Sequence, residues 1–241
     1  METKITATRG RGGVTYAVLQ QSLDQTISRQ QMEEASVAVP SVARADCAVL
    51  QRELFGIVVR GLERAEALAF QAALRMRGFP TDVVADDELP ELAEPVRGLA
   101  LQTEPDALVN TDLYGRHQRF ARAETVFLAG GFVSVRERRL RPTEAEEFRL
   151  DLFIGHEPWR VQWVLGGDSV WRVNDRAYQL RDRWELAELL RGLREYLPGE
   201  RVNRGIRDAG IAEPVVYPSV RAFEEEIIWR FFHLSQSAVQ P

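Results

Sequence analysis

The sequence predicts an α+β protein made of two modules joined in series. Over residues 55–84, a short apolar run, a helix-forming segment and a second apolar run follow one another. Short alternating segments separated by glycines occupy residues 107–173, and a leucine-striped helical pattern follows over residues 182–197. The first pattern is typical of a βαβ unit, whereas the other two are typical of an antiparallel β module closed by a helix.

The predicted βαβ unit has clear boundaries. Residues 55–60 are β-branched and apolar, as expected for a buried strand, and residues 63–77 contain only good helix formers. Gly78 stands where a helix C-cap is expected, and Pro80 prevents the helix from resuming before a second strand at residues 82–85. This unit resembles half of a ferredoxin-like module, a type used for ligand sensing and for pairing.

The helix of this unit has two apolar faces. One stripe at helical spacing has small side chains suited to packing on a sheet, and we expect it to face the strands: Ala65, Leu68, Ala69, Ala72 and Met76. Phe70 and Leu74 lie on nearly the opposite face. Either another part of the chain covers them, or they form a protein-contact surface.

The predicted modules fall at 1–50, 51–96, 97–198 and 199–241. Residues 1–50 are glycine- and glutamine-rich and predict a partly disordered arm, and Met32 is an alternative start. An acidic, proline-containing stretch at residues 86–106 is interpreted as a linker. Its carboxylates could also suggest a Ca²⁺ or Mg²⁺ site, but their spacing matches no EF-hand loop.

The antiparallel β module spans residues 97–198. Gly130 and Gly131 are expected to interrupt two strands, and residues 166–168 to form the turn of a hairpin. Together with the strand–turn–strand around Tyr114-Gly115-Arg116 and the closing helix, this pattern resembles the pleckstrin-homology-like barrels of bacteria over residues 97–197. The resemblance implies a scaffold for peptides, lipids or domain contacts.

A second amphipathic helix is predicted over residues 220–234. Phe223, Ile227, Phe231 and Leu234 share one face, while Trp229 lies on the far side with Phe232 between. Trp229 and Phe232 are either embedded in a core or presented to a partner groove.

Composition narrows the function classes. The 241 residues carry a formal net charge of −5, so no general attraction to nucleic acid or an anionic membrane is expected. The single cysteine, Cys47, fits a reducing cytoplasm, and no apolar run is long enough to span a membrane. No metal, nucleotide or nucleophile motif occurs, so we expect no cofactor. An enzyme that uses paired carboxylates, for example Asp151 with Glu157, is the third hypothesis.

One locally basic region could bind an anion such as a phosphate, a phospholipid headgroup or an acidic peptide. It combines a predicted turn with nearby arginines: Tyr114, Arg116, His117, Arg119, Arg136 and Arg138. Alternatively, these residues form a solvated face that pairs with the acidic linker. The sequence thus favours a non-catalytic scaffold or adaptor that contacts other chains or itself, with a small-anion sensor as the alternative and an unidentified enzyme as the third hypothesis.

Overall fold

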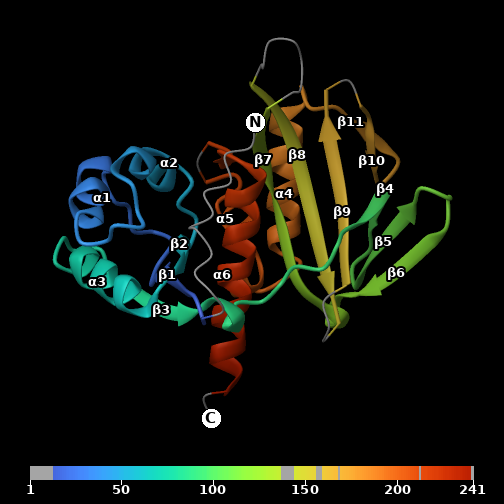
Figure 1. Ribbon diagram of the computed structural model, residues 1–241. Helices are drawn as coiled ribbons and strands as arrows, with labels where there is room; N and C mark the ends of the chain where they lie inside the picture. Colours follow the sequence, from blue (N-terminus) through green and yellow to red (C-terminus); the bar gives the residue numbers. More distant parts are fainter. Residues whose placement is uncertain (1–12, 137–143, 156–158, 168, 212, 240–241) are drawn as a thin grey trace. The chain divides into compact units, whose positions relative to one another are not determined.

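The computed structural model describes residues 13–136, 144–155, 159–167, 169–211 and 213–239 (Figure 1). The chain divides into two compact units. Unit 1 comprises residues 1–91 and 224–241, and unit 2 comprises residues 92–223. The second boundary falls in the first turn of the last helix, α6 (Val220–Val239). The protein is therefore α+β, as predicted. Its division into units differs from the predicted modules, because the first fifty residues and most of α6 belong to unit 1 together with the βαβ region.

Unit 1 contains a three-stranded sheet in the order β2-β1-β3, formed by β1 (Tyr16–Gln20), β2 (Ile57–Leu62) and β3 (Thr81–Ala85). The helix α3 (Arg64–Arg75) connects β2 to β3. Because β1 is antiparallel to both neighbours, β2 and β3 run parallel to each other with β1 between them. The predicted βαβ unit is present in its split form.

The first fifty residues contribute the middle strand of this sheet and two helices, α1 (Arg29–Ser36) and α2 (Cys47–Arg52). Val18 packs into the core on one face of the sheet, and Ala17 and Leu19 into the core on the other. The prediction of a partly disordered arm therefore differs from the structure over the described residues. A central strand buries both faces, and this holds the segment in place.

Helix α3 is rotated relative to the prediction. Phe70 and Leu74 are fully buried with Ala67 against the core, whereas Leu68 is 45% and Met76 79% exposed. The expectation that the alanine stripe faces the sheet is wrong. Burial of an aromatic ring and a leucine removes more apolar surface from water than burial of alanines, so the larger side chains take the inner face.

Unit 2 is organised around a nine-stranded sheet. Its longest path runs β11-β10-β4-β9-β8-β7-β12, and β5 and β6 continue outward from β4. The strands are β4 (Val96–Thr103), β5 (Ala107–Asp112), β6 (His117–Ala121), β7 (Thr125–Arg136), β8 (Glu144–Ile154), β9 (Trp159–Gly166), β10 (Trp171–Val173), β11 (Arg176–Tyr178) and β12 (Val216–Tyr217). Among the described strands β6, β11 and β12 each have one neighbour, so the sheet is open. The predicted barrel is not found, and the resemblance to pleckstrin-homology-like domains is unconfirmed.

The helix α4 (Arg183–Arg194) lies against one face of this sheet (Figure 1). Its predicted stripe packs inward, with Leu186, Leu190 and Leu193 buried and Leu189 partly buried. The short helix α5 (Arg204–Arg207) follows. Single 3-10 turns occur at Arg44–Asp46, Asp86–Glu88, Arg122–Glu124 and Gly199–Arg201.

Two strand predictions in unit 2 are corrected. Gly130 and Gly131 do not interrupt a strand, because β7 continues through both. They allow close approach instead: a Cβ atom at Gly130 would lie 2.5 Å from Leu190 Cδ2. The hairpin predicted at residues 166–168 is absent, since β4 lies between β9 and β10. The two-residue hairpin turn is Asn174-Asp175, where both residues have positive φ.

Candidate functional site

The turn at the basic region is built around a buried carboxylate. Asp112 accepts hydrogen bonds from the Tyr114 N–H at 2.8 Å, the Arg116 N–H at 3.0 Å and Arg116 Nε at 2.7 Å. Burial alone raises the pKa of Asp112, but the hydrogen bonds from Arg116 and Tyr114 outweigh it and hold the pKa below its usual range. Tyr114 is 84% exposed, and the Arg116 guanidinium carbon lies 5.2 Å from the centroid of its ring.

The other residues of the turn are also engaged within the chain. Arg119 donates to Glu104 at 3.0 Å and to Asp106 at 2.9 Å, both in the acidic segment. His117 Nδ1 lies 3.1 Å from the Thr111 hydroxyl. Arg119 thus pairs with carboxylates of the acidic segment, which was the alternative to an anion site. Arg116 pairs instead with Asp112 of its own turn. The Arg136 side chain and Arg138 lie outside the described part of the chain.

The apolar residues considered as protein contacts are buried. Phe70 and Leu74 are 0% exposed, and Trp229 and Phe232 are 7% and 8% exposed. Trp229 Nε1 donates to the Gln20 carbonyl at 2.7 Å, and its ring occupies the space that a side chain at Gly56 would fill. The hypothesis that these four side chains form an exposed contact surface is therefore wrong. They hold helices against the two faces of the unit 1 sheet.

Asp151 is part of a buried polar cluster. Its carboxylate pairs with Arg160 at 2.6 Å and accepts a hydrogen bond from Gln162 at 3.0 Å. Burial raises the pKa of Asp151 above its usual value, although the positive charge of Arg160 acts to lower it. Glu157, its proposed catalytic partner, lies outside the described residues. Within the described ranges, no group of three or more His, Cys, Asp or Glu is placed to hold a metal.

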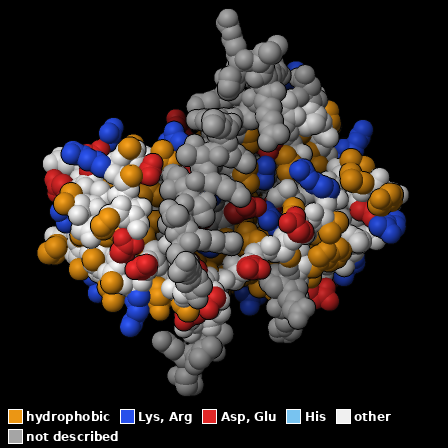
Figure 2. Space-filling model, viewed as in Figure 1, with side chains coloured by type: hydrophobic (Ala, Val, Ile, Leu, Met, Phe, Trp, Pro, Cys, Tyr) orange, Lys and Arg blue, Asp and Glu red, His pale blue; other side chains and the backbone are white. Residues whose placement is uncertain are grey.

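A different apolar surface lies on the outer side of α3. Leu68 and Met76 are exposed together with Ala65 and Ala72, and Ala69 is half-buried. We call these five residues the α3 stripe. Hydrophobic side chains reach the surface over this part of unit 1 (Figure 2). The sequence pattern found this stripe but assigned it to the wrong side of the helix.

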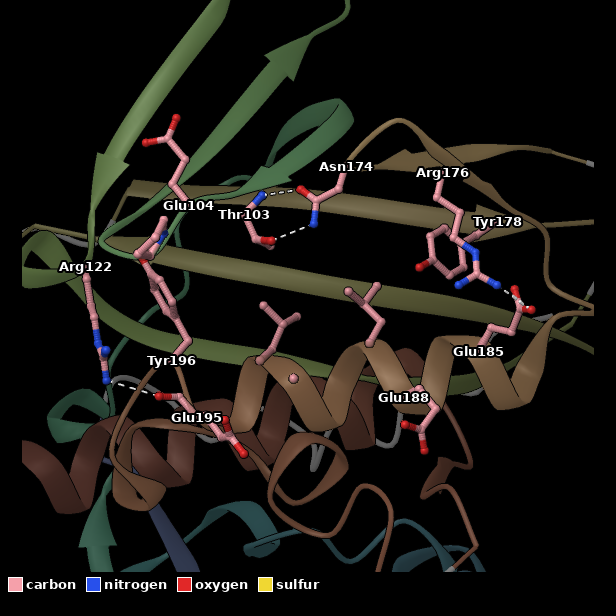
Figure 3. Close-up of a pocket in the computed structure, with 14 residues that line it drawn as sticks. Thr103, Glu104, Arg122, Asn174, Arg176, Tyr178, Glu185, Glu188, Glu195 and Tyr196 are labelled. Atoms are coloured by element: carbon pink, nitrogen blue, oxygen red, sulfur yellow. Dashed lines mark hydrogen bonds and ion pairs between the residues drawn. The ribbon is translucent and has the colours of Figure 1, made fainter.

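Unit 2 contains a cleft that the sequence did not predict. It has a volume of about 550 Å³ and lies between α4 on one side and the β4–β5 connection and the β10–β11 hairpin on the other (Figure 3). Leu189, Gly192, Leu193 and Tyr196 come from or follow α4, and Tyr178 comes from β11. We call this the α4 cleft. Gly192, a glycine inside an otherwise strong helix-forming segment, is the one sequence signal for it.

Polar interactions tie the walls of the α4 cleft together. Arg176 of β11 pairs with Glu185 of α4 at 2.6 Å, and Arg122 donates to the Glu195 carbonyl at 3.1 Å (Figure 3). Asn174 donates to Thr103 Oγ1 and accepts from the Thr103 N–H, both at 2.7 Å, and so joins the β10–β11 hairpin to the end of β4 within one wall. The contacts of Arg176 and Arg122 are the ones that connect α4 and the residues after it to the opposite wall.

Comparison with known proteins gives no match: no protein-family model, curated protein or solved structure is similar to this chain. Across the described part of the chain, no helix is both long and apolar enough to cross a membrane.

Proposed function

We propose that this chain is a non-catalytic scaffold that associates with a second copy of itself through the α3 stripe. The observation that carries the proposal is an apolar face on a helix whose opposite face already fills the core of unit 1. Helices on the surface of a globular protein normally have a polar outer face, so a second apolar face points to a contact. The association needs no cofactor. The buried free thiol of Cys47 suits a reducing cytoplasm.

The order of large and small side chains on the α3 stripe favours an antiparallel pair. If two copies of α3 cross about a twofold axis at the middle of the helix, Met76 of one copy lies over Ala65 of the other. Ala69 then lies beside Ala72, and this allows close approach. Antiparallel helices also place the positive end of each helix dipole beside the negative end of the other.

A single helix face is smaller than the roughly 800 Å² per partner of a standard interface, so we expect weak association. Dissociation constants in the micromolar range or above are consistent with such an interface. Contacts with other protein chains through the same face are the alternative, which predicts that the isolated protein stays monomeric at every concentration.

Sedimentation velocity over low micromolar to near-millimolar concentrations tests the proposal. We expect the average mass of the wild-type protein to rise toward that of a dimer, and Leu68→Glu and Met76→Glu to remain monomeric. Val170→Glu is the matched control, because Val170 is an exposed apolar residue of unit 2. Circular dichroism establishes that each variant is folded. A wild-type protein that stays monomeric throughout, or stripe variants that associate like the control, would overturn the proposal.

A further inference from the structure

We propose that Met76 is a site of reversible oxidation, and that its oxidation separates the two copies joined by the α3 stripe. This inference rests on the function proposed above, because it requires the α3 stripe to be the contact. It adds the chemical event that controls that contact, which is the conversion of the Met76 thioether to a sulfoxide.

The sulfur-containing side chains of unit 1 differ strongly in exposure. Met32 and Cys47 are both 0% exposed and belong to one core cluster, whereas Met76 is 79% exposed. Among the residues that the structure describes, Met76 is therefore the exposed sulfur-containing side chain, and Met1 lies outside them. A peroxide reaches an exposed thioether more easily than a buried one, so we expect oxidant to act first on Met76.

Met76 is placed so that a change at its sulfur leaves the fold of unit 1 intact. The residue is the C-cap of α3, and its main-chain N–H donates to the Ala72 and Leu74 carbonyls. These hydrogen bonds do not involve the side chain. The inner face of α3 is filled by Phe70 and Leu74, which are fully buried. Oxidation of Met76 therefore changes the outer surface of α3 and not its packing.

The oxidant is hydrogen peroxide. The thioether sulfur donates an electron pair to one peroxide oxygen, so that an S–O bond forms and the O–O bond breaks. The other oxygen leaves as water with both peroxide protons. Sulfur is oxidised, the peroxide is reduced, and the product is methionine sulfoxide. The step needs no catalytic group from the protein.

The sulfoxide makes an apolar side chain of the α3 stripe polar. In the antiparallel pair, Met76 of each copy lies over Ala65 of the other, so a twofold axis repeats this contact at both ends. The methyl group of Ala65 offers no hydrogen-bond donor. Burial of the sulfoxide oxygen against it costs free energy, because the oxygen loses its hydrogen bonds to water.

The guanidinium groups next to Met76 in the chain are engaged elsewhere. Arg75 donates to the Thr81 carbonyl at 2.8 Å, and Arg77 pairs with Glu34 at 3.2 Å. A sulfoxide oxygen at Met76 would have to compete with these acceptors for a donor from its own helix. The polar product is therefore accommodated best in water, which favours the separated copies.

The weak association expected for a single helix face makes the change reversible. Monomers are always present, and in a monomer Met76 is open both to peroxide and to the reductases that convert each sulfoxide epimer back to methionine. Association in turn covers Met76, so the paired form is expected to be oxidised more slowly than the monomer.

Sedimentation velocity before and after treatment with hydrogen peroxide, with peptide mass spectrometry on the same samples, tests this inference. We expect the peptide that contains Met76 to gain an oxygen atom before the peptide that contains Met32. The dissociation constant of the oxidised protein should rise about tenfold or more, with an unchanged circular dichroism spectrum. Methionine sulfoxide reductases A and B should restore association. Met76→Leu is the control: whatever its own affinity, peroxide should leave its dissociation constant unchanged.

The outcomes separate this inference from the proposed function. If the untreated protein is monomeric at every concentration, both are wrong. If the untreated protein associates and keeps its dissociation constant after Met76 has been oxidised, the inference alone is wrong. It is also wrong if Met32 reacts before Met76, or if peroxide weakens the association of Met76→Leu as much as that of the wild type.

Discussion

Asn203 hydrogen-bonds both main-chain groups of Gly130. Its Oδ1 accepts from the Gly130 N–H at 2.9 Å, and its Nδ2 donates to the Gly130 carbonyl at 3.0 Å. The same amide accepts from the Ile206 N–H and donates to the Tyr217 hydroxyl at 2.8 Å. A side chain thus takes the place of a neighbouring strand beside β7, and it also caps α5.

Asn203→Ala should lower the free energy of unfolding by about 2–4 kcal/mol, because it leaves the buried main-chain groups of Gly130 without partners. Urea denaturation followed by circular dichroism measures this change. Gln102→Ala removes an exposed amide from β4 and should change the free energy by less than about 0.5 kcal/mol. If both variants unfold at the same urea concentration as the wild type, the role given to Asn203 is wrong.

Gly56 and Gly78 form a matched pair for testing how α6 packs in unit 1. Both have positive φ, at 97° and 75°, so alanine is strained at either position by about 1–2 kcal/mol. Only at Gly56 would the added Cβ also meet a neighbour, 2.5 Å from Trp229 Cγ. Gly56→Ala should therefore destabilise by a further 1–3 kcal/mol or so. Equal melting temperatures for the two variants would contradict this packing.

His233 should make unit 1 less stable in mild acid. Burial lowers the pKa of His233, the charge of Arg230 adds to this, and Asp82 opposes it. The folded pKa of such a histidine lies below its unfolded value of about 6.5. Its contribution to the free energy of unfolding is therefore fully present above about pH 6.5, and it is lost as the pH falls from there toward the folded pKa.

His233→Gln removes this pH dependence. The wild type should lose more free energy of unfolding than the variant between about pH 7.5 and about pH 5. Urea denaturation at both values measures the two differences. A variant that loses as much stability as the wild type over this interval would show that other groups control the acid response.

Local patterns predicted the parts of the fold that depend on neighbouring residues. The leucine stripe from Leu186 to Leu193 packs as its spacing indicates. The βαβ unit is also present, because its strands and helix are signalled within thirty residues or so. Non-local insertions were not predictable in this way. Strand β1 enters between β2 and β3, and β4 between β9 and β10, and no local signal fixes such neighbours.

The candidate sites depended on choices that the sequence left open. Helix α3 has two apolar faces, and the pattern alone did not decide whether Phe70 or Leu68 lies inside. The basic turn was visible, but its partners Glu104 and Asp106 are brought to Arg119 by strand pairing. The α4 cleft combines residues as far apart as Thr103 and Tyr196, and only the fold brings them together.

Disulfide trapping between two variants, each with one introduced cysteine, tests the antiparallel α3 contact most directly. One protein carries Ala65→Cys and the other Met76→Cys; the native Cys47 is fully buried and does not compete. We expect a mixture of the two proteins under mild oxidation to form the mixed disulfide dimer faster than either protein alone forms its own. We also expect Leu68→Glu in both proteins to suppress the reaction. A mixed dimer that forms no faster than the two self-paired dimers would contradict an antiparallel α3 contact.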